Sequence, residues 1–383
     1  QNGVKELFLP AENAAEAAVA KGLTVYPART AQQVVLHLCG AEKLTPAEPT
    51  GYDADGVWLG ADMADVRGQL VARRALEVAA CGGHNLVFVG SPGSGKSMLA
   101  KRLPGILPPL TYEEAVETSA VYSVAGLVPA GKGLVRARPF RSPHHSVSAT
   151  AIAGGGSVPR PGEVSLAHNG VLFLDELPEF SREALEVLRQ PLEDGIVTVS
   201  RVHGSATYPC KFMLVAAMNP CKCGYLGHPT RPCSCTPSAV DQYLRRISGP
   251  LMDRIDLHVH VEPVAYGDLA QAADGESSAA IRTRVAAVRQ IQRERYKALP
   301  GVYCNAQLPG NRLRQFCPMT PAAEAVLRAA FERMGLSARA YDRILRVSRT
   351  VADMDGSEVL DSRHIAEAVQ YRSLDRRFTP VSL

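Results

Sequence analysis

The stretch Gly90-Ser91-Pro92-Gly93-Ser94-Gly95-Lys96-Ser97 decides the fold. It follows the apolar run Leu86-Val87-Phe88-Val89, which is typical of a buried parallel strand, and a helical pattern continues from Met98. A strand, a loop of the form Gly-x4-Gly-Lys-Ser and a helix together are the context of a phosphate-binding loop. Glycines let backbone N–H groups turn inward around anionic oxygens, so residues 90–98 are predicted to bind nucleotide phosphates.

Polar side chains around this loop have predicted roles in ATP chemistry. Lys96 would reach the β and γ phosphates, and the Ser97 hydroxyl would ligate Mg²⁺. A second apolar strand, residues 171–174, runs into Asp175-Glu176, and ligands bind at the carboxyl ends of strands in such sheets. We expect Asp175 to hold the Mg²⁺ shell and Glu176 to orient or polarise the attacking water; a solvated acidic turn is the alternative.

Two more residues have predicted catalytic roles. Asn219 follows a third apolar strand, where its amide would position the lytic water; the alternative is an ordinary loop start before Pro220. Arg254 precedes a fourth apolar strand and is predicted to be an arginine finger in the nucleotide site of a neighbouring subunit, which requires a ring or filament. A surface ion pair between Arg254 and Asp253 or Asp256 is the alternative.

Strands that alternate with helices predict an α/β fold with a doubly wound parallel sheet. The expected elements are apolar strands at 86–89, 171–174, 212–218 and 255–261, a helix from Met98 that Pro104 ends, and a helix at 181–192. The predicted domains are an α/β fragment at 1–43, a linker at 44–62, the α/β core at 63–263, a long helix with a connector at 264–310, and a small all-helical domain at 311–383.

Composition is that of an ordinary globular protein. The 383 residues allow two or three domains, and 46% of them are apolar. No apolar segment approaches the ~20 residues that span a bilayer, and no signal peptide opens the sequence, so we predict a cytoplasmic protein without membrane association. The net charge of +4 is too mild to require nucleic acid as a partner. Gln1 stands inside a predicted element, so we expect a further segment upstream.

Nine cysteines without a secretory signal disfavour a disulfide framework. Four of them form two Cys-x-Cys pairs, Cys221-Lys222-Cys223 and Cys233-Ser234-Cys235, separated by nine residues that include two glycines and two prolines. Four thiolates brought together by such a turn suit a structural, tetrahedral Zn²⁺ site. Four reduced surface cysteines, or His228 as a substitute ligand, are the alternatives.

Taken together, these motifs resemble those of the magnesium-chelatase-like AAA+ ATPases, and within them the ComM/YifB group. The similar stretches cover nearly the whole chain and lie at 90–97, 138–145, 169–180, 217–221, 251–258 and 337–346. The N-terminal fragment, residues 1–40, resembles the end of a Lon-protease-like domain. The resemblance implies an AAA+ P-loop core with a helical lid and part of a Lon-like domain ahead of it.

The resemblance also implies a hexameric ATP-dependent helicase that acts on single-stranded or branched DNA and promotes branch migration in recombination or natural transformation. It implies that Arg339 in the lid is the second sensor, which touches the γ-phosphate, with Arg343 and Arg346 further along the same helix as alternatives. A rival function is that of a chelatase-type motor, which remodels a partner protein during metal insertion into a porphyrin. The pair His144-His145 has no predicted role.

Two insertions are candidates for DNA contact. Residues 153–162 form a glycine-rich loop with Arg160 near its tip, and residues 196–208 alternate like a β-hairpin that carries Arg201 and His203. In related AAA+ proteins such insertions project into the ring channel, where these side chains would contact phosphates without reading sequence. The alternative is that both loops serve subunit packing.

Overall fold

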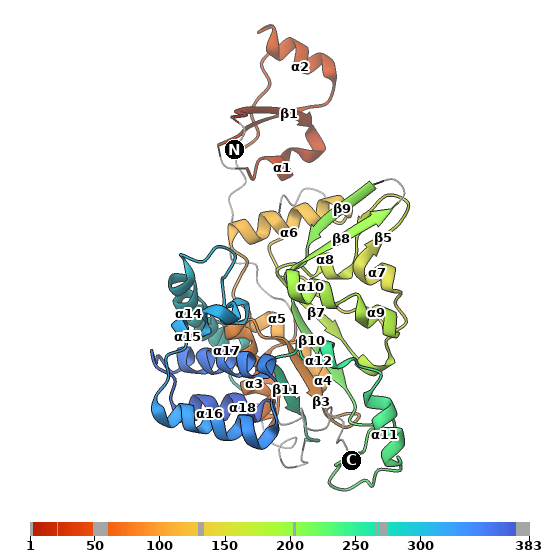
Figure 1. Ribbon diagram of the computed structural model, residues 1–383. Coiled ribbons are helices and arrows are strands. Elements are labelled where there is room, and N and C mark those ends of the chain that lie inside the picture. The colour runs from red at the N-terminus through yellow and green to blue at the C-terminus, as the bar shows by residue number, and fades with distance from the viewer. Residues whose placement is uncertain are drawn as a thin grey trace. The chain divides into compact units, whose positions relative to one another are not determined.

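The computed structural model describes residues 3–20, 22–48, 60–128, 134–201, 204–264, 267 and 275–372 (Figure 1). The chain divides into two compact units, Gln1–Val57 with Pro109–Arg138 and Trp58–Pro108 with Pro139–Leu383, and each is described by itself. Among the described residues, no helix is both long enough and apolar enough to cross a bilayer. The cytoplasmic location stays a prediction.

The first unit is a small α/β fragment. Strand β1 (Glu6–Pro10) pairs in parallel with β2 (Thr24–Ala28), and Ala14, Ala18 and Val25 form the buried cluster beside them. Such short side chains bury little apolar area, so this core contributes modestly to stability. The helices of this unit are α1 (Ala14–Ala17), α2 (Ala31–Leu38) and α6 (Tyr112–Val124).

The second unit is built on a five-stranded parallel sheet with the strand order β11-β3-β10-β7-β4. In register, Val89 lies beside Met218, and Leu174 lies beside Ala216. This sheet, with helices around it, confirms the predicted α/β class. The strands are β3 (Leu86–Val89), β4 (Phe140–Arg141), β7 (Val171–Leu174), β10 (Met213–Met218) and β11 (Leu257–His260).

Alternate residues of the three central strands, β3, β10 and β7, enter two different hydrophobic cores, because successive side chains of a strand point to opposite faces. In β3, Leu86 and Phe88 join one core, while Val87 and Val89 join the other. Both faces are therefore covered, as fully apolar strands predict. The second core is closed by α7 (Ala149–Ala153), α8 (Glu163–Leu166), α9 (Arg182–Glu186), α10 (Arg189–Asp194), α11 (Pro237–Leu244) and α12 (Gly249–Met252).

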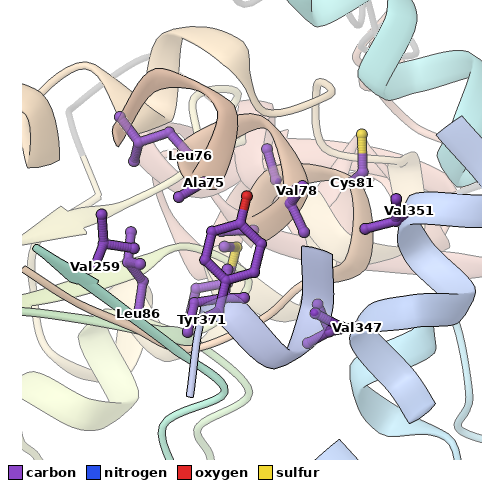
Figure 2. Packing of buried hydrophobic residues seen from close by; sticks show 14 of the residues in the cluster. Ala75, Leu76, Val78, Cys81, Leu86, Val259, Val347, Val351 and Tyr371 are labelled. Carbon is purple, nitrogen blue, oxygen red and sulfur yellow. The ribbon is translucent and has the colours of Figure 1, made fainter. Parts of the chain in front are cut away.

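The first core is continuous with the C-terminal helical domain. Figure 2 shows Tyr371 among apolar side chains from α3, β3, β11 and α17, among them Leu76, Leu86, Val259 and Val347. One hydrophobic cluster thus joins the sheet to α3 (Leu70–Gly82), which precedes β3, and to the helices that follow the sheet. The later helices are α14 (Ser278–Tyr296), α15 (Leu313–Phe316), α16 (Pro321–Met334), α17 (Ala338–Met354) and α18 (Ser362–Gln370).

A buried ionic network adds polar contacts to this junction. Asp256, at the start of β11, forms an ion pair with Arg343 of α17, and its other oxygen lies 3.5 Å from His84 Nδ1. His84 Nε2 lies 2.7 Å from the hydroxyl of Thr350, also in α17. Burial alone would raise the pKa of the Asp256 carboxyl, but Arg343 and His84 outweigh burial and hold that pKa well below its usual range.

The helix after the phosphate-binding loop differs from the prediction. Helix α4 (Lys96–Ala100) is followed by a separate α5 (Leu103–Ile106), and Pro104 lies in the first turn of α5 instead of ending a helix. Proline is tolerated there because an N–H in the first turn has no helical partner. The helix expected at 181–192 is divided into α9 and α10.

Two antiparallel hairpins project from the framework of the second unit. In the first, β5 (Gly154–Gly155) pairs with β6 (Arg160–Pro161). In the second, β8 (Ile196–Arg201) pairs with β9 (Gly204–Pro209), which confirms the hairpin expected at 196–208. Both belong to the part of the unit that carries α7 to α10 (Figure 1).

The Asp256–Arg343 pair yields a stability prediction. Arg343→Ala leaves a buried carboxylate without its cation, so the free energy of unfolding should fall by about 3–5 kcal/mol in urea denaturation. Without Arg343, burial makes the Asp256 carboxyl bind a proton at a higher pH than in the wild type, so the deficit should narrow as the pH is lowered through the pKa of Asp256 in the variant. The control Arg328→Ala removes an exposed pair with Glu324 and should cost less than about 1 kcal/mol. Equal losses in the two variants would contradict the prediction.

Candidate active site

Glycines shape the loop between β3 and α4. Gly93 and Gly95 have φ values of +76° and +91°, a region that side-chain-bearing residues rarely adopt. A Cβ atom added to Gly90 would lie 2.2 Å from the carbonyl oxygen of Val261, so a larger residue cannot fit there. The hydroxyl of Ser91 is buried and has no hydrogen-bond partner among the described residues. This curled backbone and the unpaired hydroxyl fit a phosphate-bearing ligand.

Lys96 lies inside this loop and is nearly buried. Its Nζ donates to the carbonyl oxygens of Gly90 and Ser91, both at 2.8 Å, and to Asn219 Oδ1 at 3.2 Å. Burial lowers the pKa of Lys96, and the negative charge of Asp175 opposes that shift. The structure therefore joins the loop after β3 to the residue after β10 through one ammonium group.

The hydroxyl of Ser97 and the carboxylate of Asp175 meet at the carboxyl end of the strand β7. Ser97 Oγ donates to Asp175 Oδ2 at 2.5 Å, and Asp175 Oδ1 accepts the backbone N–H of Glu176 at 3.0 Å. A hydroxyl beside a carboxylate is an oxygen donor set that suits Mg²⁺. Met98, the last residue of the predicted phosphate-binding set, packs its side chain against the core.

Glu176 follows β7 with an unusual backbone and a partner that sequence reasoning did not assign. Its φ of +53° lies in the left-handed region, where a residue with a side chain is strained. Its Oε2 lies 3.2 Å from His145 Nδ1. His145 follows β4, which is only two residues long and gave no periodic signal in the sequence. The pair His144-His145 was conspicuous in the sequence, but its contact depends on the order of the strands.

Arg254 and Arg339 lie close together near the amino ends of the parallel strands. These ends form the edge of the sheet opposite to the one that carries the phosphate-binding loop. Leu257, the first residue of β11, pairs with Leu86, the first residue of β3, whereas the phosphate-binding loop follows the last residue of β3. Among the described residues, Arg254 forms an ion pair with Glu193 of α10 instead of Asp253 or Asp256, and its hydrogen bond lowers the pKa of that glutamate. Arg339 Nη1 lies 3.6 Å from Asp253.

The three arginines considered as the second sensor differ in exposure. The side chain of Arg339 is 66% exposed, while those of Arg343 and Arg346 are 17% and 15% exposed. Arg343 is engaged by Asp256, and Arg346 Nε donates to the carbonyl oxygen of Leu308 at 2.8 Å. Arg339 is therefore the arginine of the three whose geometry leaves it accessible to a phosphate.

The four cysteines of the two Cys-x-Cys pairs form one cluster. Their sulfur atoms lie within 4.8 Å of one another, and Cys221 Sγ is 3.4 Å from Cys223 Sγ and 3.7 Å from Cys233 Sγ. Four thiolates around a tetrahedral zinc lie roughly 3.8 Å apart, given Zn–S bonds of about 2.3 Å. Cys235 completes the set, whereas His228 hydrogen-bonds with its own loop through Thr230 and Arg231.

The cysteine cluster lies beside the phosphate-binding loop. Gly224, directly after Cys223, packs so closely on Pro92 that an added Cβ would lie 2.5 Å from Pro92 Cδ. Cys221 also comes two residues after Asn219, which accepts from Lys96. A rigid cluster would therefore brace two parts of the nucleotide site.

The structure describes the three candidate DNA-contact residues, Arg160, Arg201 and His203, to different extents. Arg160 lies in β6 with an exposed side chain. The backbone of Arg201 ends β8, but its side chain and all of His203 lie outside the described residues. Tyr208 Oη donates to the carbonyl oxygen of Pro159 at 2.9 Å, so the β8–β9 hairpin contacts the β5–β6 hairpin directly.

Two family models and several known proteins are similar to this chain. The family model "magnesium chelatase, subunit ChlI" matches residues 62–269, and its C-terminal counterpart matches residues 275–372. The chain is 44% identical to YifB of Salmonella typhimurium over 374 residues, which are 97% of this chain and 72% of YifB. It is 43% identical to competence protein ComM of Haemophilus influenzae over 389 residues, covering 100% of this chain and 74% of ComM. Identity to the magnesium-chelatase 67 kDa subunit of Chlorobaculum parvum is 30%, over 41% of this chain and 23% of that subunit.

Proposed function

Because the chain belongs to the magnesium chelatase ChlI family of AAA+ proteins, in the group of YifB and ComM, we propose that it is an ATP-driven DNA motor. It acts as a hexamer on single-stranded or branched DNA and promotes branch migration. The observation that carries the proposal is a divided site, with phosphate-binding groups at one edge of the sheet and two arginines at the other. Similarity to a competence protein over the whole chain supports DNA as the substrate, while similarity to a chelatase subunit over 41% of it supports the chelatase alternative less.

ATP is the proposed substrate of the loop at 90–98. Lys96 and the backbone N–H groups of the loop bind the phosphates, and Ser97 and Asp175 hold Mg²⁺, which neutralises charge on the phosphate oxygens. Glu176 polarises a water molecule and takes up its proton while the water oxygen attacks the γ-phosphorus, and Asn219 keeps that water in line. The bond from the γ-phosphorus to the bridging oxygen breaks, and ADP and phosphate leave.

Arg254 and Arg339 are proposed to complete the site of a neighbouring subunit. They share the edge of the sheet opposite to Lys96 of the same chain, so they are poorly placed to reach the phosphates that this Lys96 binds. An interface in which the loop edge of one subunit meets the arginine edge of the next repeats around a ring. An arginine supplied in this way stabilises charge on the transferred phosphoryl group.

Complementation between two inactive variants tests this arrangement. Lys96→Ala and Arg254→Ala should each lose ATP hydrolysis, the second by about 10³-fold or more. Mixed after subunit exchange, they should regain activity, because random assembly in a ring makes about a quarter of the interfaces intact in both halves. Steady-state phosphate release measures the recovery. If the mixture hydrolyses ATP no faster than either variant alone, Arg254 does not act in the nucleotide site of a neighbouring subunit.

The two projecting hairpins are proposed to contact DNA. The contact of Tyr208 with Pro159 supports their moving as one element, with Arg160 exposed on it. Arg201 and His203 belong to the same proposal on the strength of the sequence. Contacts from such side chains to phosphates are independent of base sequence and weaken with salt.

A forked DNA substrate tests the motor function. The wild-type protein should displace a strand in the presence of ATP, and Lys96→Ala should not. Arg160→Ala should weaken DNA binding in fluorescence anisotropy and reduce the slope of log affinity against log salt by about 1, the loss of one phosphate contact.

The matched control for this experiment is Arg328→Ala, an equal loss of charge on helix α16. It should leave the salt slope unchanged. If Arg160→Ala binds DNA as the wild type does, the β5–β6 hairpin has no part in DNA binding. If hydrolysis responds to a protein partner and never to DNA, the chelatase-type alternative gains support.

A structural Zn²⁺ ion is proposed for Cys221, Cys223, Cys233 and Cys235. Four thiolate ligands close a tetrahedral site and leave no open position for chemistry, so the role of the ion would be structural and not catalytic. Its place beside Pro92 and Asn219 gives it an indirect effect on ATP binding.

Metal analysis tests the zinc site. Freshly purified protein should contain about one zinc per chain, and Cys223→Ser with Cys235→Ser should lose it, because two thiolates cannot close the site. The KM for ATP should rise several-fold in that variant as Pro92 loses its brace. Cys39→Ser, which removes an exposed cysteine outside the cluster, should change neither quantity. Wild-type protein with far less than one zinc per chain would overturn the proposal.

A further inference from the structure

Residues 221–235, the cysteine loop, carry aromatic and basic side chains that the proposed zinc site does not use. Two glycines with positive φ give the loop its shape, Gly224 at +84° and Gly227 at +78°. The backbone N–H of Gly224 donates to the carbonyl oxygen of Cys221 at 3.0 Å. Because its four sulfur atoms also lie within 4.8 Å of one another, the loop is a fixed support for the side chains between the cysteines.

An aromatic group of three side chains, Tyr225, His228 and Arg231, stands on this support. The rings of Tyr225 and His228 meet edge to face, with their centroids 5.6 Å apart. The guanidinium carbon of Arg231 lies 5.4 Å from the centroid of the Tyr225 ring, and Arg231 Nη1 donates to Tyr225 Oη at 3.0 Å. His228 Nδ1 accepts the backbone N–H groups of Thr230 and Arg231, at 3.2 and 3.1 Å, which holds the imidazole in one orientation. Three planar side chains are therefore arranged before any ligand binds.

The cations of the loop are not neutralised by carboxylates. Lys222 and Arg231 are exposed, and among the described residues neither of them forms an ion pair. The sequence has no aspartate or glutamate between Asp194 and Asp241, so no acidic side chain of this stretch opposes them. By contrast, Arg245, directly after α11, pairs with Asp241 at 2.7 Å. Two exposed cations beside planar groups fit an anionic ligand that also has flat faces.

We propose that the cysteine loop is a second contact site for single-stranded DNA, which rests on the motor function proposed above. Bases of a single strand stack on aromatic side chains, and the phosphates between them bind basic ones. Tyr225 and His228 stack a base, while Lys222 and Arg231 bind the phosphates beside it. Base pairing in a duplex hides the faces of the bases, so the aromatic group selects a single strand.

This site is separate from the two hairpins. Figure 1 shows the loop that leads to α11 at the end of the second unit away from the β8–β9 hairpin. The contact proposed for Arg160 and the contact of the cysteine loop are therefore made by different parts of the unit. Each of them can be removed while the other stays.

The cysteine loop also touches the nucleotide site. A Cβ atom added to Gly224 would lie 2.5 Å from Pro92 Cδ, and Asn219, two residues before Cys221, accepts from Lys96 Nζ. A strand bound on the loop holds Gly224 against Pro92 and so favours the phosphate-binding form of the loop at 90–97. Because such coupling is reciprocal, DNA and ATP strengthen the binding of each other.

Fluorescence anisotropy of a labelled single-stranded oligonucleotide tests the site. Tyr225→Leu keeps the bulk of the side chain but removes the ring, so the Kd should rise about fivefold or more, the loss of one stacked base. Tyr225→Phe keeps the ring and should bind nearly as tightly as the wild type. Lys222→Ala with Arg231→Ala should reduce the slope of log affinity against log salt by about 1.4, since each phosphate contact of a single strand contributes about 0.7.

The matched control is Arg245→Ala, which removes an exposed arginine beyond the loop and should change neither the Kd nor the salt slope. Thermal unfolding and a zinc content equal to that of the wild type show that each variant keeps the loop folded. The KM for ATP of the wild type should fall when the oligonucleotide is added, and Tyr225→Leu should lose this response. A wild-type KM that does not change overturns the link between the loop and Pro92.

The remaining outcomes separate this site from the motor function. If the folded loop variants bind the oligonucleotide as the wild type does, the cysteine loop is not a DNA site, although the motor function stands. If Lys222→Ala with Arg231→Ala abolishes binding of a labelled polyglutamate peptide and leaves DNA binding unchanged, the loop serves an acidic protein partner and the proposal is overturned. If the loop variants weaken DNA binding but the wild type displaces no strand from a fork, the site stands and the motor function fails.

Discussion

The parallel register of β3, β10 and β7 is the constraint on which the site depends. It brings the loop after Val89, the amide of Asn219 and the carboxylate of Asp175 to one edge of the sheet, where Lys96 and Ser97 join them by hydrogen bonds. A slip of one residue in any of these strands would exchange its two faces and send each side chain into the opposite core, where the packing does not fit it. The packing of the two cores therefore also fixes the geometry of the phosphate-binding groups.

The same register separates the arginines from the loop that binds phosphates. Because β11 runs parallel to β3, the residues that precede it lie at the far edge, and the Asp256–Arg343 pair fastens that edge to helix α17. Arg339 stands on the same helix, so the two arginines of the far edge are carried by one rigid junction. In the proposed ring, a change in the phosphates of one subunit would be felt by the helical domain of the next, which is the kind of connection a motor requires.

Much of this could be predicted from sequence where the signal is local. The strands at 86–89 and 171–174 have the predicted bounds, because a fully apolar run between polar loops leaves no doubt about burial. The two Cys-x-Cys pairs meet because a short turn joins them. Contacts between distant segments could not be predicted. To choose the second sensor among Arg339, Arg343 and Arg346, one must know that Arg343 is paired with Asp256. To predict the contact of His145 with Glu176, one must know that β4 lies beside β7.

Three groups that the proposed mechanism uses are each held by an acidic or basic partner at the surface. Glu176 is held by His145, Arg254 by Glu193, and Arg339 by Asp253. At least one member of each pair is more than a third exposed, and such pairs contribute only about 0–1 kcal/mol each. A phosphate or a neighbouring subunit could therefore replace them at little cost, whereas the buried Asp256–Arg343 pair would be expensive to break. This difference divides the second unit into contacts that can exchange during a cycle and contacts that keep the edges of the sheet in place.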